Sequence, residues 1–452
     1  RRSFKDDEVY KLLVREYLGH LVHGGANLEW YMEGGRSRTG KLRPPRYGLL
    51  TYLVDALKSG GAEDMLLVPV SITYDQLHEI LSMVEEEAGL RRKAPEGLSW
   101  LARYARMQQR WIGTAYVRFG EPLSLKGALG DQEGGALAVQ KVAFEVFQRI
   151  NRITPVTAPA LVTLALLAAG GRALTLAEVT RSTQPLLDYA RIRGLPTQAV
   201  AGLRDEGGVY DVLSSLATAQ VVGRYEAGTE RVFQIRPGRH GVAAFYRNSA
   251  IHWFVNRAIL ETVMLAVVDD EGSDSLETGW QAAFALRDLL KFEFFFSDKA
   301  AFEAEMREEA RILADDDFRG RVATAQGRRV LLAEAPFRVA HRVLPQFLEA
   351  YWLLAERLAA WPTGEPVVRA ALLEQCVKVG HQYVLQQRLH NPESVSRELC
   401  GNAWMLADNR GLLSEDGAGG RAAFAAELAR AVAAVAAIAT LDASTNREVA
   451  GD

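Results

Sequence analysis

The sequence predicts an α/β domain followed by a mainly α-helical region. In the first 75 residues, helical and strand patterns alternate, which is typical of an α/β fold with a parallel sheet. From about residue 134 onward, apolar residues recur at helical spacing. Four glycines gather between the two patterns, at Gly127, Gly130, Gly134 and Gly135. We therefore expect two domains, residues 1–128 and residues 129–452.

The expected first domain begins with an amphipathic helix over residues 5–23, which has Asp6 and Asp7 at its start and Gly24-Gly25 past its end. Alternating apolar and polar residues at 27–33 predict a half-buried strand. A second helix is expected from about Tyr47 to Gly60. The apolar run at 65–72 predicts a strand buried on both faces, and the alternation at 114–119 predicts a further strand.

In the expected second domain, the apolar run from Pro155 to Gly170 is shorter than the roughly 20 residues of a membrane-spanning helix, so we expect a buried helix. Residues 172–240 read as helices followed by a hairpin, an order that can suggest a winged helix. This segment carries nine basic and seven acidic residues, a weak footprint for DNA, so a packing role is favoured. The alanine-rich stretch Arg421–Thr440 predicts a helix that packs on the rest.

Composition narrows the class of protein. A net charge of −3 argues against a nucleic-acid binder. The two cysteines, Cys376 and Cys400, lie far apart and lack metal-ligand spacing, so we expect neither a disulfide framework nor a zinc site, and a reducing cytosol fits. The chain opens Arg-Arg-Ser-Phe without an initiator Met or a targeting segment. We expect that the N-terminus is missing.

A basic, glycine-rich loop follows the strand expected at 27–33. Between Arg36 and Arg46 there are five basic residues and no acidic one, on a backbone interrupted by glycines and prolines. Arginine can grip two phosphate oxygens at once, and glycines let backbone N–H groups approach the same oxygens. The end of a strand is where open α/β sheets bind ligands. The loop therefore predicts a phosphate site, with a merely solvated surface loop as the alternative.

The segment Glu33-Gly34-Gly35-Arg36-Ser37-Arg38-Thr39-Gly40 resembles a signature of the glycerol-3-phosphate acyltransferases. Arg1-Arg2 look like the end of that family's Phe-Ile-Arg-Arg block, and Val68–Tyr74 is similar to another block. Further similar segments are Tyr116–Pro122, Ile153–Pro155, Tyr246–Asn248 and Phe347–Trp352. The resemblance covers nearly the whole chain and is specific to the large bacterial membrane-associated type. It implies an α/β acyltransferase domain, incomplete at its N-terminus, and a helical C-terminal domain.

The resemblance also implies the chemistry. In the family, the histidine of a His-x-x-x-x-Asp pair acts as general base on the sn-1 hydroxyl of glycerol 3-phosphate, and the alkoxide-like oxygen attacks an acyl thioester. None of the eight histidines here has Asp five residues on. No catalytic residue is therefore assigned, and truncation of the sequence is the favoured explanation over loss of activity.

The family pattern assigns Arg1, Arg2, Arg36 and Arg38 to the phosphate. It also places Gly34 and Gly35 in the site, and Ser37 can donate a hydrogen bond. Glu33 is expected to contact the glycerol hydroxyls or to hold an arginine, with a structural ion pair as the alternative, because a carboxylate would repel the phosphate. Pro69 lies beside the site in the family, or only shapes a strand. The remaining cations of the loop could meet CoA phosphates, an acidic carrier protein or anionic lipid: Lys41, Arg43 and Arg46.

The expected activity is acyl transfer from acyl-CoA or acyl carrier protein to the sn-1 hydroxyl of glycerol 3-phosphate, at the cytoplasmic face of a bacterial membrane. Because the longest apolar stretch is short of a spanning helix, any membrane contact is expected to be peripheral. We expect no metal, no cofactor besides the acyl donor and no nucleic acid. Two alternatives stay open. An enzyme acting on dihydroxyacetone phosphate would use the same phosphate grip, and a non-catalytic phosphate- or lipid-binding module would need no base.

Overall fold

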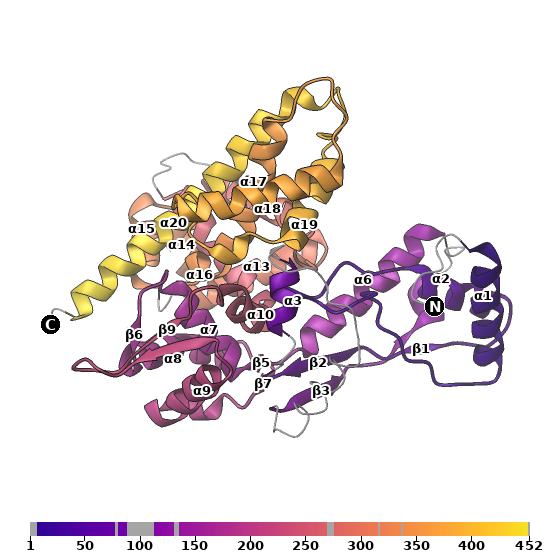
Figure 1. Cartoon of the computed structure of the whole chain (residues 1–452), viewed down its shortest axis with the longest axis horizontal. Coiled ribbons are helices and arrows are strands. Elements are labelled where there is room, and N and C mark those ends of the chain that lie inside the picture. Colours follow the sequence, from indigo (N-terminus) through magenta and orange to yellow (C-terminus); the bar gives the residue numbers. More distant parts are fainter. Residues whose placement is uncertain are drawn as a thin grey trace. The chain divides into compact units, whose positions relative to one another are not determined.

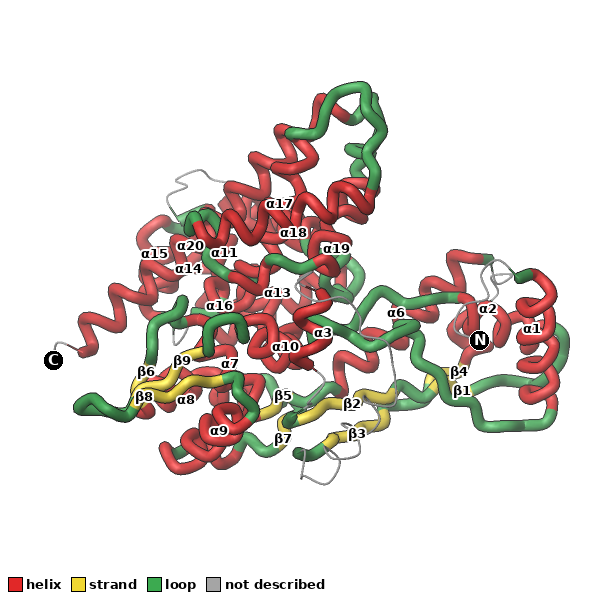
Figure 2. Tube along the Cα trace, in the orientation of Figure 1, coloured by secondary structure: helices red, strands yellow, loops and turns green. Residues whose placement is uncertain are grey.

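A computed structural model describes residues 7–76, 80–87, 113–130, 135–268, 275–314, 317–335 and 338–450 (Figure 1). This part of the chain is mainly helical, with short strands in small sheets (Figure 2). It divides into two compact units. We call them the first unit (Arg1–Ser37, Lys41–Thr73 and Ala115–Thr154) and the helical unit (Arg38–Gly40, Tyr74–Thr114 and Pro155–Asp452).

The first unit opens with the two expected helices. Helix α1 spans Glu8–His23, and the Asp7 side chain caps it by accepting a hydrogen bond from the Tyr10 backbone N–H. Helix α2 spans Gly48–Lys58 and buries Leu50, Leu53 and Val54. Both were predicted from apolar spacing and terminal glycines.

The strand predicted at 27–33 is wrong. The structure assigns no strand to these residues. The alternation does mark an apolar face, because Leu28 and Trp30 pack against Val22, Leu53 and Ala56 on the two helices. Helix surfaces therefore satisfy the apolar side chains, and the stretch needs no partner strand.

The predicted strand at 65–72 is two short strands. Strand β1 (Leu66–Leu67) pairs antiparallel with β4 (Leu123–Ser124), and β2 (Val70–Tyr74) pairs with β3 (Ala115–Phe119). Pro69 separates β1 from β2, since it lacks the N–H that a continuous ladder needs. The expected parallel sheet with a strand buried on both faces is therefore wrong, because β1 and β4 run antiparallel and Leu66 and Ile72 are exposed.

Helices α5 (Leu125–Leu129) and α6 (Ala136–Ile153) complete the first unit. Helix α6 buries Val142, Ala143 and Phe147 and contacts α2 and α5. The sequence placed a domain boundary after residue 128, whereas the last segment of the first unit runs to Thr154 because α6 packs against α2 and α5. Of the glycines at the predicted boundary, Gly130 caps the end of α5 with φ +58°, and Gly135 caps the start of α6.

The helical unit is built around α7 (Ala158–Ala168), in which every residue from Ala158 to Leu167 is buried. The predicted buried helix is thus confirmed. Short parallel strands β5 (Val156–Thr157) and β7 (Thr197–Gln198) flank it in sequence, and α3 (Ile80–Glu87) contacts α10 in the same unit.

The order suggestive of a winged helix is also present. After α7 come β6 (Leu174–Thr175), α8 (Leu176–Ile192), the 3-10 turn η1 (Ala201–Arg204), α9 (Glu206–Thr218), β8 (Val222–Tyr225) and β9 (Val232–Ile235). The strands form one sheet in the order β6-β9-β8. Helix α9, which holds the place of a recognition helix, carries no Lys or Arg. The absence of cations on α9 favours the packing role that the sequence also favours, and that role stays a prediction.

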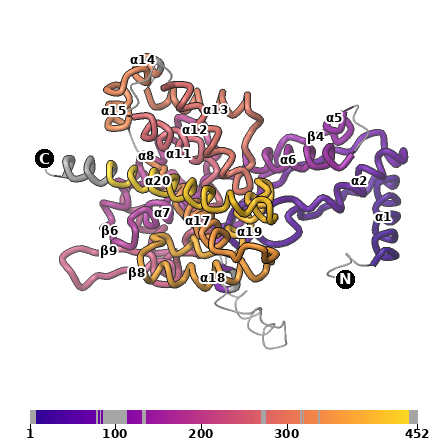
Figure 3. Tube along the Cα trace, turned by 90° about the horizontal axis from the view of Figure 1, so that it is seen from above, coloured from indigo at the N-terminus to yellow at the C-terminus, as the bar shows by residue number. Residues whose placement is uncertain are grey.

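The rest of the helical unit is a bundle centred on α17 (Pro345–Ala359), which is buried along most of its length and contacts α18, α19 and α20 (Figure 3). The other elements are α10 (His240–Ala250), η2 (Ile251–Phe254), α11 (Val255–Ala266), α12 (Ser275–Leu289), α13 (Lys299–Ala314), α14 (Phe318–Val322), α15 (Ala325–Glu334), α16 (Ala340–Val343), α18 (Arg369–Leu385), η4 (Pro392–Ser394), α19 (Arg397–Asn409), η5 (Ala418–Gly420) and α20 (Arg421–Ala450).

Helix α20 confirms the helix predicted at Arg421–Thr440. Within the described residues, the stretch Ala418–Leu441 is long and apolar enough to cross a membrane, with a mean hydropathy of 1.7, and 22% of its most apolar window is buried. Phe424, Leu428, Val435 and Ile438 of this helix are buried in the core of the helical unit. By length and composition alone the stretch is weak evidence for a membrane span, and these four apolar side chains are used in packing.

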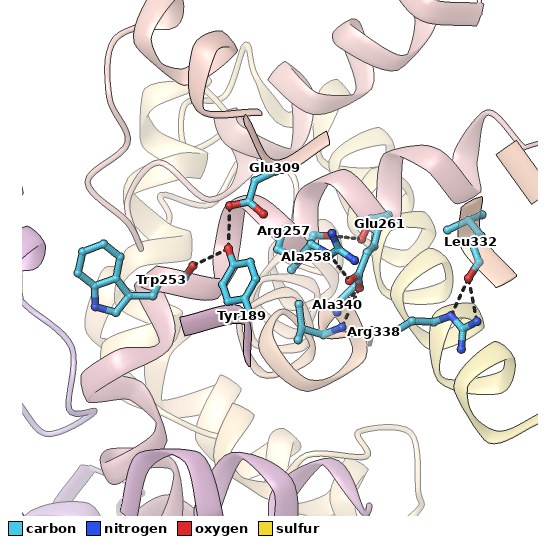
Figure 4. Close-up of polar contacts among 11 residues, drawn as sticks. Tyr189, Trp253, Arg257, Ala258, Glu261, Glu309, Leu332, Arg338 and Ala340 are labelled. Carbon is cyan, nitrogen blue, oxygen red and sulfur yellow. Dashed lines mark hydrogen bonds and ion pairs between the residues drawn. The ribbon is translucent and has the colours of Figure 1, made fainter. Parts of the chain in front are cut away.

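A buried polar cluster lies inside the bundle (Figure 4). Glu261 pairs with Arg257 on α11 and also accepts hydrogen bonds from the backbone N–H groups of Val339 and Ala340. Nearby in the bundle, the Tyr189 hydroxyl donates to Glu309 at 2.7 Å. Burying such charges is favourable only if they are paired and hydrogen-bonded. The first set of contacts joins α11 to the start of α16, and the second joins α8 to α13.

The buried Glu309 predicts a pH dependence of stability. Burial raises the pKa of Glu309, while the Arg193 guanidinium and the Tyr189 hydroxyl oppose that rise. A carboxyl whose pKa is higher in the folded chain binds more protons when folded, so stability falls as pH rises between the two pKa values. We expect Glu309→Gln to remove part of the stability loss that the wild type shows above pH ~4.3, the ordinary glutamate pKa. Urea denaturation from pH 4 to 8 measures this.

The matched control is Glu303→Gln on the same helix, at a more exposed carboxylate. It should leave the pH profile of the wild type unchanged. Parallel profiles for the wild type and Glu309→Gln would contradict the prediction.

Candidate functional site

The predicted site residues lie on an irregular loop, except for Arg1 and Arg2, which fall outside the described residues, and Pro69. Residues 33–46 contain no helix or strand. Arg36 is exposed, whereas Ser37 and Arg38 are partly buried. We call residues 33–46 the basic loop.

Glu33 joins the start of the basic loop to its last residues, and we call these two stretches the arms of the loop. Its carboxylate accepts a hydrogen bond from the Arg43 backbone N–H at 2.9 Å. Next to it, the Met32 carbonyl accepts the Arg46 backbone N–H at 2.7 Å. Of the roles that the sequence left open for Glu33, these contacts favour a structural one, in which the carboxylate fixes the loop backbone.

The glycines of the motif allow the arms to lie close together. Gly34 has φ +67°, and a Cβ there would lie 2.8 Å from Arg46 Cγ. A Cβ on Gly35 would lie 3.1 Å from a guanidinium nitrogen of Arg43. Arg43 had the weaker claim in the sequence, yet its guanidinium lies against the motif. A side chain at Gly34 would be strained both by its left-handed backbone conformation and by the close approach to Arg46 Cγ.

The centre of the basic loop belongs to the helical unit. Thr39 is buried, and its hydroxyl donates to Glu398 of α19 at 2.9 Å. Its backbone carbonyl accepts a hydrogen bond from the Asn248 side-chain amide of α10 at 2.7 Å. Gly40 has φ +84°, and a Cβ there would lie 2.0 Å from the Phe245 carbonyl oxygen. Two hydrogen bonds from two helices therefore hold Thr39, and Gly40 lies too close to α10 to accept a side chain.

A buried network supports Asn248. Its carbonyl oxygen accepts hydrogen bonds from Gln346 at 2.8 Å and from Arg247 at 3.2 Å. Arg247 pairs with Glu393 at 3.1 Å, and both side chains are almost fully buried. Burial lowers the pKa of Arg247, and the Glu393 carboxylate opposes this shift. Each charge in the network thus has a partner of opposite sign.

Glu349 completes this region on α17. Its carboxylate accepts hydrogen bonds from the backbone N–H groups of His390 and Asn391 and from the Ser394 hydroxyl. Burial raises the pKa of Glu349, and these hydrogen bonds pull it down. Glu349 therefore holds the segment that leads into α19, where Glu398 lies.

Sequence reasoning did not assign site roles to Asn248, Gln346 or Glu398. Asn248 lies within the segment Tyr246–Asn248, which the resemblance included. A usable signal was present in α10 and α17, where polar residues interrupt helical stretches that are otherwise apolar. Such buried polar residues need partners, which the sequence does not identify.

Pro69 is buried between β1 and β2, and its carbonyl accepts the Gly120 backbone N–H at 2.8 Å. This contact joins two segments that the resemblance singled out, Val68–Tyr74 and Tyr116–Pro122. Close by in the same unit, the hydroxyls of Ser71 and Thr154 share a hydrogen bond of 2.8 Å. These contacts favour the strand-shaping role for Pro69.

Among the residues that the structure describes, no group of three or more His, Cys, Asp or Glu side chains could hold a metal ion. Cys376 and Cys400 are buried and are not joined in a disulfide. What the basic loop offers chemically is positive charge on a backbone held by hydrogen bonds, which suits an anionic ligand.

Comparison with known proteins found one matching family and several similar proteins. Residues 83–416 match the family described as "Glycerol-3-phosphate acyltransferase C-terminal region". Proteins named "Putative acyltransferase plsB1" from Mycobacterium bovis and from two strains of Mycobacterium tuberculosis are each 41% identical to this chain over 451 residues. The match takes in 98% of this chain and 72% of each relative.

The matched range includes the Asn248 network and extends through α19. The similarity to the three mycobacterial proteins spans almost the whole chain, and so includes the basic loop as well. The chain therefore belongs to the glycerol-3-phosphate acyltransferase family.

Proposed function

We propose that this chain binds the phosphate of glycerol 3-phosphate on the basic loop and serves the transfer of a fatty acyl group from acyl-CoA or acyl carrier protein to the sn-1 hydroxyl. The observation that carries the proposal is the motif Glu33–Gly40, whose backbone is held by Glu33 on one side and through Thr39 on the other. Family membership supports the same substrates.

Arg36 and Arg38 are the proposed phosphate ligands. Their guanidinium groups can donate two parallel hydrogen bonds to phosphate oxygens, and such charge-assisted bonds are stronger than neutral ones. The loop contains Gly34, Gly35 and Gly40, so its N–H groups can approach an anion closely. Holding the backbone before the ligand arrives reduces the entropy that binding must overcome.

The reaction also needs a base for the sn-1 hydroxyl. The His-x-x-x-x-Asp pair that the resemblance implies does not occur in residues 1–452. General-base catalysis typically contributes about 10²- to 10⁴-fold in rate. We therefore expect this chain to bind glycerol 3-phosphate and to turn it over slowly unless the pair is supplied.

We place the activity at the cytoplasmic face of a bacterial membrane, with peripheral contact. The apolar stretch Ala418–Leu441 and the cations of the basic loop are compatible with a lipid surface.

Arg36→Ala and Arg38→Ala test the phosphate assignment. Hydrogen bonds to charged groups contribute about 1.5–3 kcal/mol each, so we expect each change to weaken binding by roughly 10- to 100-fold. Isothermal titration calorimetry with glycerol 3-phosphate measures the affinity. Arg430→Ala, at an exposed arginine of α20, is the control and should bind as the wild type does. Unchanged affinity in both loop variants would contradict the assignment.

A non-catalytic phosphate- or lipid-binding module is the second candidate, and the missing pair favours it. An acyl-transfer assay with radiolabelled glycerol 3-phosphate and palmitoyl-CoA separates the two functions. It should be run on this chain and on a form extended upstream. Activity in the extended form supports the acyltransferase, whereas phosphate binding without activity in either form supports the module. Replacing glycerol 3-phosphate by dihydroxyacetone phosphate in the same assay tests the other acceptor.

A further inference from the structure

We propose that Asn248 and Glu398 are positioning residues that hold the basic loop in its binding conformation, so that the helical unit sets the affinity for the phosphate. This inference rests on the proposed function. Neither residue needs to touch the ligand, because both act on Thr39, the neighbour of Arg38.

The contacts hold two polar groups of Thr39, its backbone carbonyl and its hydroxyl. Asn248 donates to its backbone carbonyl at 2.7 Å, and its hydroxyl donates to Glu398 at 2.9 Å. The carbonyl contact restrains the peptide that follows Thr39, and the hydroxyl contact restrains its side-chain rotamer. Because Arg38 is the preceding residue, these restraints on Thr39 limit the positions that the Arg38 backbone can take. A solvated surface loop would have neither of these two hydrogen bonds.

The orientation of the Asn248 amide follows from its other contacts. Its oxygen faces two donors, Gln346 and Arg247, so its nitrogen must face the Thr39 carbonyl. Asn248 is 3% exposed. It therefore cannot exchange this bond for one to water without local opening of the helical unit.

The residues that hold Thr39, together with their own partners, come from elements far apart in the chain, and we call this set the anchor. Asn248 lies on α10, Gln346 on α17, Glu393 on η4 and Glu398 in the first turn of α19. Arg247 links two of them by its ion pair with Glu393. Buried networks in which the members have partners rigidify the groups they contain. A rigid anchor of this kind is suited to fixing the geometry of a binding loop.

The test compares Asn248→Ala and Glu398→Ala with Asn402→Ala. Asn402 is also buried, and its amide donates to the Glu293 carboxylate at 3.1 Å, but that bond does not involve the basic loop. Two readouts are needed for each variant of the full chain. Calorimetry gives the affinity for glycerol 3-phosphate, and hydrogen-exchange mass spectrometry gives the protection of residues 33–43. Thermal denaturation records general stability.

We expect Asn248→Ala and Glu398→Ala to lower the affinity by about tenfold or more and to speed exchange in residues 33–43. Asn402→Ala should lower the melting temperature comparably while leaving both readouts at the wild-type values. The inference is overturned if loop exchange stays at the wild-type rate in both anchor variants, or if Asn402→Ala loosens the loop equally. A wild-type chain that binds no glycerol 3-phosphate, with exchange still faster in Asn248→Ala, would overturn the proposed function and retain the positioning.

Discussion

Gly40→Ala is expected to detach the basic loop from α10 and to abolish measurable binding of glycerol 3-phosphate. Gly40 has φ +84°, and an added Cβ would lie 2.0 Å from the Phe245 carbonyl oxygen. A left-handed backbone costs a non-glycine residue about 1–3 kcal/mol. The contact is with backbone, which cannot swing aside as a side chain can, so the loop itself must move. Calorimetry measures the affinity, and hydrogen exchange of residues 33–43 measures the release.

Gly238→Ala is the matched control in the same unit. Gly238 has φ +75°, but a Cβ there meets nothing within 4 Å. This variant therefore reports the backbone strain alone and should bind glycerol 3-phosphate as the wild type does. Wild-type affinity in Gly40→Ala would show that the contact between the loop and Phe245 does not matter for binding.

The helices were predictable because their signals are local. Apolar spacing and terminal Asp or Gly residues suffice to place α1 and α2, and an unbroken apolar run suffices for α7. The sheets were not predictable in the same way, because strand pairing depends on segments far apart in sequence. The stretch 27–33 shows the difference: its alternation correctly marked an apolar face, and helices rather than a strand cover it.

The basic loop was predictable from its own composition, whereas its anchors were not. Asn248 and Thr39 are 209 residues apart in sequence, and Thr39 and Glu398 are 359 apart. No local pattern links such residues. The structure thereby gives the helical unit a role that sequence reasoning could not assign, namely to support the loop through α10 and α19.

The helical unit relies on buried charge for its own stability, and Glu261→Gln is expected to destabilise this unit strongly. One Glu261 oxygen accepts from Arg257 Nε at 2.9 Å, and the other accepts two backbone N–H groups at 2.8 Å. A glutamine has one acceptor oxygen, so it can serve the Arg257 side or the backbone side but not both (Figure 4). The other side then faces an NH₂ donor. Arg257 is 0% exposed, so water cannot replace the lost partner.

Breaking a buried ion pair from one side typically costs about 3–5 kcal/mol, and we expect a loss of that size in urea denaturation. Glu303→Gln provides the control, since its i,i+4 pair with Arg307 on α13 is largely solvated and should contribute roughly 0–1 kcal/mol. The double variant Arg257→Met/Glu261→Gln removes the buried guanidinium and frees the glutamine oxygen for Val339 and Ala340. It should be more stable than Glu261→Gln alone. If the double variant is instead less stable by the sum of the single losses, the cost does not come from the unpaired charge.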